Sequence, residues 1–131
     1  MARSGSEVIR KHFQLAAEFM ETARSNFDNG YFRSAADRAY YAMFHAATAA
    51  LLSKGIQEVK SHAALIQLFG KEFVATKLVD AEMNKQLQRA FDLRQKSDYD
   101  IAASFDENNV EQMVEWAQEF VQKTKEILEI T

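Results

Sequence analysis

The sequence predicts an all-α protein, an up-and-down bundle of four long helices and one short helix. Three observations predict this fold: the 131 residues contain no proline and only four glycines, 47% of them are hydrophobic, and the hydrophobic positions recur at alternating steps of three and four. Scarce turn formers disfavour a sheet of many short strands, whereas this spacing is typical of helices with one buried face. A chain of this length fits one core, so we expect a single domain over residues 1–131.

The first helix is predicted from about Ser6 to Asp28. Ser4 and Glu7 have the spacing of a capping box at its start, and Asn29-Gly30 suits its end because both residues tolerate the left-handed conformation. Its apolar face consists of Ile9, Phe13, Ala16, Met20, Ala23 and Phe27.

The second helix is predicted from Tyr31 to Lys54, with Gly55 ending it. Apolar residues, most of them alanine, cover most of its circumference, which predicts a buried helix with close neighbours. One arc of roughly 100° remains polar when the helix is turned at about 100° per residue. That polar stripe consists of Ser34, Asp37, Arg38, Tyr41, His45 and Thr48.

Three further helices follow along the chain. Ser61 is placed to cap a short third helix, Asp80 to cap a fourth, and Ser104 with Glu107 to form a capping box for a fifth. The apolar seam of the fourth helix arrives at Arg94, where a hydrophobic residue is due.

Composition and motifs exclude several function classes. Sixteen basic against nineteen acidic residues give a net charge of -3, which disfavours a protein that coats duplex DNA. No apolar run is long enough to span a membrane, and the absence of cysteine fits a cytoplasmic protein. No metal-ligand spacing and no glycine-rich phosphate loop is present, so we expect neither a metal nor a cofactor.

Arg94 is the first candidate for chemistry. A guanidinium in an apolar seam requires a partner, and the candidates are Asp98, one turn further on, and Asp37 from the second helix. This arrangement has two interpretations: a structural clamp that closes the end of the bundle, or a positive pocket that holds phosphate through two nitrogens at once.

The polar stripe of the second helix is the second candidate. Arg38 and His45 lie two turns apart with Tyr41 between them, so an arginine that holds phosphate and a histidine that moves a proton share one side. The alternative is a strip that only forms hydrogen bonds within the bundle or faces water. His62 at the start of the third helix is expected to be neutral, and His12 is interpreted as ordinary surface.

Four segments of the chain are informative when they are taken together: Ala-Ala-Asp-Arg-Ala-Tyr-Tyr-Ala-Met-Phe-His-Ala (residues 35–46), Ser61-His62, Leu93-Arg94-Gln-Lys-Ser-Asp98-Tyr99, and Ala117-x-x-Phe120-Val121. In combination they resemble the HEPN domain family, in particular its small stand-alone bacterial and archaeal members. The resemblance covers nearly the whole chain. It implies a four- or five-helix bundle, commonly a homodimer, in a family that includes RNA-cleaving toxins paired with a minimal nucleotidyltransferase and nucleotide-binding accessory domains.

Active ribonucleases of that family carry an arginine followed a few residues later by a histidine. In this chain Asp98-Tyr99 follows Arg94 instead. The leading interpretation is therefore a domain that binds a nucleotide or an RNA phosphate and serves as the partner of a nucleotidyltransferase in a toxin-antitoxin type module. The alternatives are a metal-independent endoribonuclease toxin and a bundle that only binds protein.

These interpretations assign roles to eight residues. Candidate catalytic residues are Arg94, Asp98 and His45, and candidate ligand-binding residues are Arg38, Tyr41, Tyr99, Asp37 and His62.

Overall fold

The structure, a computed structural model, describes the backbone of residues 2–57, 59–99 and 105–128, and the side chains of residues 7–57, 59–96 and 105–128. Every element in these ranges is helical, which confirms the all-α fold with four long helices and one short one. The elements are α1 (Ala2–Asp28), α2 (Phe32–Ser53), α3 (His62–Phe69), the π-helical segment η1 (Gly70–Val74), α4 (Ala81–Tyr99) and α5 (Glu107–Ile127).

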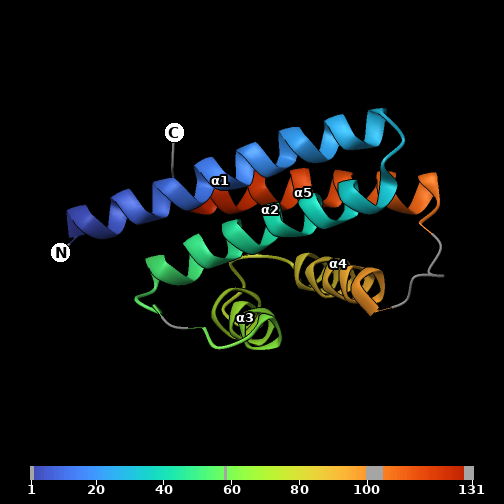
Figure 1. Ribbon diagram of the computed structural model, residues 1–131. Coiled ribbons are helices and arrows are strands. Elements are labelled where there is room, and N and C mark those ends of the chain that lie inside the picture. The colour runs from blue at the N-terminus through green and yellow to red at the C-terminus, as the bar shows by residue number, and fades with distance from the viewer. Residues whose placement is uncertain (1, 58, 100–104, 129–131) are drawn as a thin grey trace.

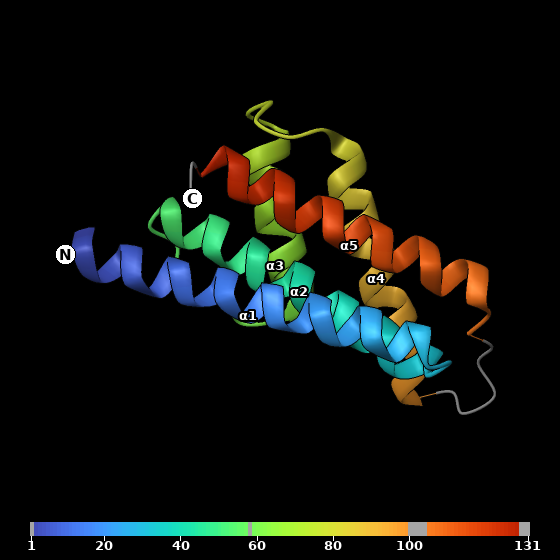
Figure 2. The ribbon, with the colours of Figure 1, turned by 90° about the horizontal axis from the view of Figure 1, so that it is seen from above.

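Helix α2 is the centre of the bundle and touches each of the other four α helices. Helices α1, α2 and α5 extend lengthwise beside one another, while α3 and α4 cross them and are seen nearly end-on in Figure 1. The view from above in Figure 2 shows the same crossing. Residues on one side of α2 can therefore meet side chains from α1 and from the α3–α4 pair.

Alanine allows α2 to occupy this position. Because the side chain of alanine is small, neighbouring helices approach α2 closely, and the alanines that face them are fully buried. These residues are Ala35, Ala36, Ala39, Ala42, Ala46, Ala47, Ala49 and Ala50. Glycines with positive φ, Gly30 at 82° and Gly55 at 83°, stand at the breaks on either side of α2, as predicted.

Large apolar side chains fill the space between the crossing helices. The ring of Phe69 packs 5.0 Å from that of Phe73 and 5.1 Å from that of Phe120, measured between centroids, so α3, η1 and α5 share one aromatic core. Within the described ranges, no helix combines the length and the apolarity needed to cross a bilayer.

The helix starts agree with the sequence prediction in part. Ser61 caps α3 as predicted: its hydroxyl accepts a hydrogen bond from the backbone N–H of Ala64 at 3.0 Å. The predicted start of the first helix is wrong, because α1 already begins at Ala2 and Ser4 lies inside it. No residue before Ser4 breaks a helix, so the pattern extends upstream of the expected Ser4–Glu7 capping box.

The residue predicted to cap the fifth helix is also wrong. Asp106 caps α5, and its carboxylate accepts hydrogen bonds from the backbone N–H and the side-chain amide of Asn109, both at 2.8 Å. Aspartate caps as well as serine does and stands directly before the helix, so it takes the place expected for the Ser104–Glu107 box. Ser104 itself lies outside the described residues.

Candidate functional site

Arg94 reaches from α4 to the polar stripe of α2. Its Nε donates to Oδ1 of Asp37 at 3.3 Å, which also makes an ion pair, and its Nη2 donates to the hydroxyl of Tyr41 at 2.7 Å. The side chains of Arg94 and Asp37 are 19% and 32% exposed. Asp37 is thus one of the two carboxylates that the sequence offers as partners for Arg94. The side chain of Arg94 is largely buried but keeps some contact with solvent.

Two tyrosine rings support the same guanidinium. The Cζ atom of Arg94 lies 4.9 Å from the ring centroid of Tyr41 and 5.7 Å from that of Tyr40. Such cation–π contacts add attraction and restrict the orientation of the planar group. Tyr40 is fully buried, whereas Tyr41 is half-buried.

His62 brings the start of α3 to this site. Its Nδ1 lies 2.5 Å from the hydroxyl of Tyr40, and its ring stacks on Phe91 of α4 with centroids 5.5 Å apart. Burial, followed by the positive charge of Arg94, lowers the pKa of His62, so the imidazole is neutral at neutral pH as expected. We call Asp37, Tyr40, Tyr41, His62 and Arg94 the Arg94 cluster.

His45 does not join the Arg94 cluster. It forms a pair with His12 of α1, in which the two Nδ1 atoms lie 3.0 Å apart, so one ring donates and the other accepts. Burial lowers the pKa of both imidazoles, and the neighbouring His12 lowers that of His45 further. The prediction that His12 is ordinary surface is wrong, because α1 packs this histidine against His45 of α2.

A signal for this histidine pair does exist in the sequence. The Asn29-Gly30 turn makes α1 and α2 antiparallel neighbours, so residues at similar distances on either side of the turn lie level with each other. His12 and His45 satisfy that condition approximately, so the position of the turn indicates that they lie close together.

Arg38 belongs neither to the Arg94 cluster nor to the His12–His45 pair. It is exposed, and its Cζ atom lies 5.6 Å from the ring centroid of Phe19 on α1. Phe19 also stacks on Tyr41 at 5.8 Å and on His45 at 5.4 Å. The stripe Arg38, Tyr41 and His45 thus follows one side of α2, as its spacing predicted, but its members have different partners.

Two predicted site residues cannot be placed in the cluster. The backbone of Asp98 and Tyr99 belongs to α4, but their side chains lie outside the described residues. In the part of the chain whose side chains are described, no group of three or more histidine, cysteine, aspartate or glutamate residues is arranged to hold a metal ion.

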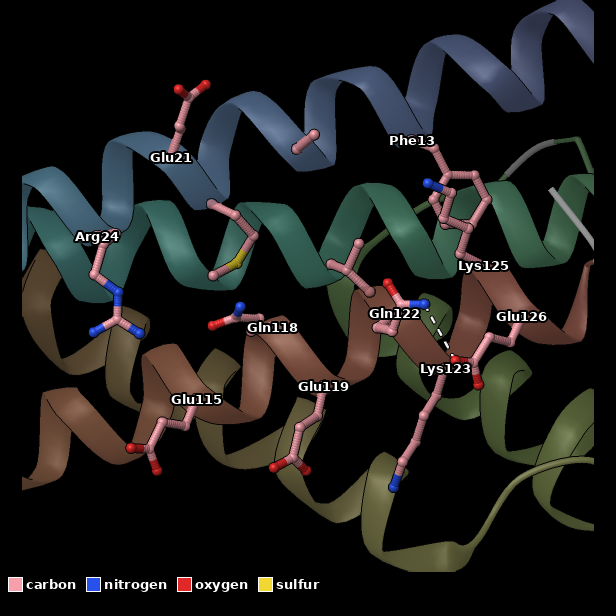
Figure 3. A pocket seen from close by; sticks show the side chains of 13 residues that line it. Phe13, Glu21, Arg24, Glu115, Gln118, Glu119, Gln122, Lys123, Lys125 and Glu126 are labelled. Carbon is pink, nitrogen blue, oxygen red and sulfur yellow. Dashed lines mark hydrogen bonds between the residues drawn. The ribbon is translucent and has the colours of Figure 1, made fainter. Parts of the chain in front are cut away.

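A groove of about 870 Å³ lies between α1 and α5, away from the predicted site residues. Figure 3 shows Phe13 in this groove and charged side chains of both helices around it, among them Arg24, Glu115 and Glu119. None of the eight residues predicted for the site lines it.

The chain is similar to several archaeal and bacterial proteins. One from Methanocaldococcus jannaschii, named "Putative toxin MJ0605", is 34% identical over 122 residues, which cover 93% of this chain and 90% of that protein. A UPF0332 protein of Archaeoglobus fulgidus is 37% identical over 117 residues, covering 89% of this chain and 92% of that protein. A UPF0332 protein of Thermotoga maritima is 33% identical over 123 residues, covering 94% of this chain and 92% of that protein.

A family model, that of the HEPN domain, matches residues 9–128. The match includes all of α2, α3, α4 and α5, and with them every member of the Arg94 cluster. The chain therefore belongs to the HEPN domain family.

Proposed function

We propose that the Arg94 cluster binds the phosphate of a nucleotide or of RNA. The observation that carries the proposal is the position of Arg94, a partly exposed guanidinium held in the seam of the bundle by Asp37 and Tyr41. A fixed arginine fork suits a phosphate, which offers several oxygens at once. The half-buried ring of Tyr41 can also stack on a base.

The ion pair with Asp37 does not prevent this binding. Its Nε–Oδ1 distance of 3.3 Å is beyond the usual length of a strong charged hydrogen bond, and both side chains keep some contact with solvent. The terminal phosphate of a nucleotide is a dianion and carries more charge than one carboxylate, and a phosphodiester of RNA offers two oxygens to the fork, so either can compete for the guanidinium while Asp37 turns toward water. Asp37 then acts to position the arginine before the ligand arrives.

The test is ligand-induced stabilisation. The thermal midpoint of the wild-type protein should rise in millimolar adenosine 5′-monophosphate, because a ligand that binds the folded state stabilises it by mass action. Arg94→Ala should lose this rise. Arg89→Ala is the matched control, because Arg89 belongs to the same helix but lies 5.8 Å from the ring of Trp116. Equal rises in all three proteins would reject the site.

We further propose that the chain is a homodimer and the partner of a minimal nucleotidyltransferase in a toxin-antitoxin type module. The names of its relatives support the toxin part, and the exposed Val8 and Leu15 of α1, at 42% and 39%, support the dimer. Light scattering should give twice the chain mass, and a monomer would contradict the dimer. A neighbouring reading frame should encode the nucleotidyltransferase and co-purify after co-expression, whereas an isolated gene would count against the module.

The histidine pair favours a second candidate function, a metal-independent ribonuclease. His45 and His12 share a hydrogen bond through which a proton can pass, and Arg38 lies on the same side of α2. RNA incubated with the protein and EDTA should give fragments that end in cyclic phosphate, and His45→Asn should abolish them. RNA that stays intact at high protein concentration would remove this candidate.

A further inference from the structure

The contact between Tyr40 and His62 restricts where the imidazole carries its proton. The hydroxyl of Tyr40 belongs to a fully buried side chain, and Nδ1 of His62 at 2.5 Å is its partner among the described residues. Burial holds the pKa of Tyr40 above its ordinary value, so the phenol keeps its proton. A buried O–H without an acceptor is costly, so this hydroxyl donates to Nδ1.

The other ring nitrogen of His62 must then carry the hydrogen. The pKa of His62 is lowered, which makes the ring neutral at neutral pH, and a neutral imidazole has one N–H and one acceptor nitrogen. With Nδ1 accepting from Tyr40, the N–H is at Nε2. The same contact therefore fixes both the tautomer and the edge of the ring that remains for other groups.

That edge keeps some contact with solvent. Nε2 of His62 makes no hydrogen bond to another described residue. Among the described side chains, Oδ1 of Asn84 is a buried polar atom that lacks a hydrogen-bond partner, and Nε2 of His62 is not such an atom. Nε2 is therefore not a buried atom. The ring cannot easily turn away, because it stacks on Phe91 with an interplanar angle of 12° and lies 4.9 Å from the ring of Phe44.

His62 and Arg94 stand against the same two tyrosine rings. The centroid of the His62 ring is 5.5 Å from that of Tyr40 and 6.3 Å from that of Tyr41. Arg94 is 5.7 Å and 4.9 Å from these rings, and its charge acts on His62. One small anion beside the tyrosines can thus be approached by both residues.

We propose that Tyr40 is a positioning residue that holds His62 as the Nε2–H tautomer, and that His62 donates this hydrogen bond to the same phosphate that Arg94 binds. The ligand contact rests on the proposed function, whereas the tautomer does not. As a neutral donor with its acceptor nitrogen already occupied, His62 is unsuited to act as a general base. It contributes to binding, and this contribution is constant over neutral pH.

The tautomer is tested without any ligand, by nitrogen NMR of the imidazole at pH 7.5. The wild type should show a protonated Nε2 and an unprotonated Nδ1 for His62. Tyr40→Phe should lose this preference and show a mixture, whereas Tyr41→Phe, which removes a hydroxyl that contacts Arg94 instead, should retain it. A protonated Nδ1 in the wild type, or an unchanged tautomer in Tyr40→Phe, would overturn the role of Tyr40.

The ligand contact is tested by titrating adenosine 5′-monophosphate and inorganic phosphate. A hydrogen bond to a charged group corresponds to about tenfold in affinity, so His62→Ala should weaken binding by about that factor. His62→Gln keeps an N–H donor and should restore most of it. If Arg94-dependent binding is found but His62→Ala binds as tightly as wild type, the contact is refuted and the proposed function stands. If wild type binds neither probe, the proposed function fails together with the contact, and NMR still decides the tautomer.

Discussion

Replacing Arg94 with methionine should lower the free energy of unfolding by about 2 kcal/mol. The hydrogen bond to Tyr41, at 2.7 Å and charged at one end, contributes about 1.5 kcal/mol. The partly exposed ion pair with Asp37 contributes roughly 0.5–1 kcal/mol, and the contact with the tyrosine rings roughly 0.5–1 kcal/mol. Methionine recovers about 1 kcal/mol by burying its own apolar chain, which leaves the stated net loss.

Urea unfolding followed by circular dichroism measures this loss, with Arg89→Met as the matched control. Arg89 is exposed and has a ring contact of 5.8 Å with Trp116, so its replacement should cost no more than about 0.5 kcal/mol. A double-mutant cycle of Arg94→Met with Asp37→Asn should give a coupling of about 1 kcal/mol. A coupling near zero, or equal losses for the two arginines, would refute the reasoning that Arg94 holds α4 to α2.

Three other predictions concern the histidines and the start of α3. Burial lowers the pKa of His12 and His45 below 6.5, so the unfolded chain binds more protons in acid than the folded chain does. The free energy of unfolding should therefore fall as the pH drops below about 6.5. Replacing both histidines with asparagine should make this dependence on pH weaker, as measured by unfolding experiments at several pH values. Removing the charge at Arg94 should raise the pKa of His62 toward its ordinary value, because that charge lowers it; an NMR titration in which the pKa is unchanged would contradict this. Ser61→Ala should cost about 1 kcal/mol through loss of the cap of α3, and an unaltered urea midpoint would show that the cap is unimportant.

The positions of the helices could largely be predicted from the sequence, because local signals determine them. Glycine with positive φ ends the first two helices where the pattern indicated, and the bounds of α2 agree with the prediction to within one residue at each end. The cap at Ser61 was also predicted from sequence alone. The start of α1 was not, because the Ser4–Glu7 spacing of a capping box indicated a start near Ser6, whereas the helix begins at Ala2.

The candidate site could be predicted only at Arg94, where a charged residue interrupts the apolar face of the fourth helix. Arg94 stands out because a cation replaces a hydrophobic residue, and its need for a carboxylate pointed to Asp98 and Asp37, of which Asp37 forms an ion pair with it. The pairing of Tyr40 with His62 does not interrupt the hydrophobic pattern of the sequence, since a tyrosine among alanines resembles any other core residue. It depends on how α3 crosses α2, which is decided by tertiary packing rather than by a repeat along one helix.

The alanine-lined surface of α2 has a consequence for how affinity could be adjusted. The distance between helix axes depends on the bulk of the side chains between them, so a valine at one of these positions would push a neighbouring helix outward. The side chain of Arg94 extends from α4 to Asp37 on α2 and has a limited length, so the distance between Nε and Oδ1 would change with the distance between the two helices. Substitutions of residues that do not contact a ligand would therefore change the affinity of the site, because they change the distance that the side chain of Arg94 has to span.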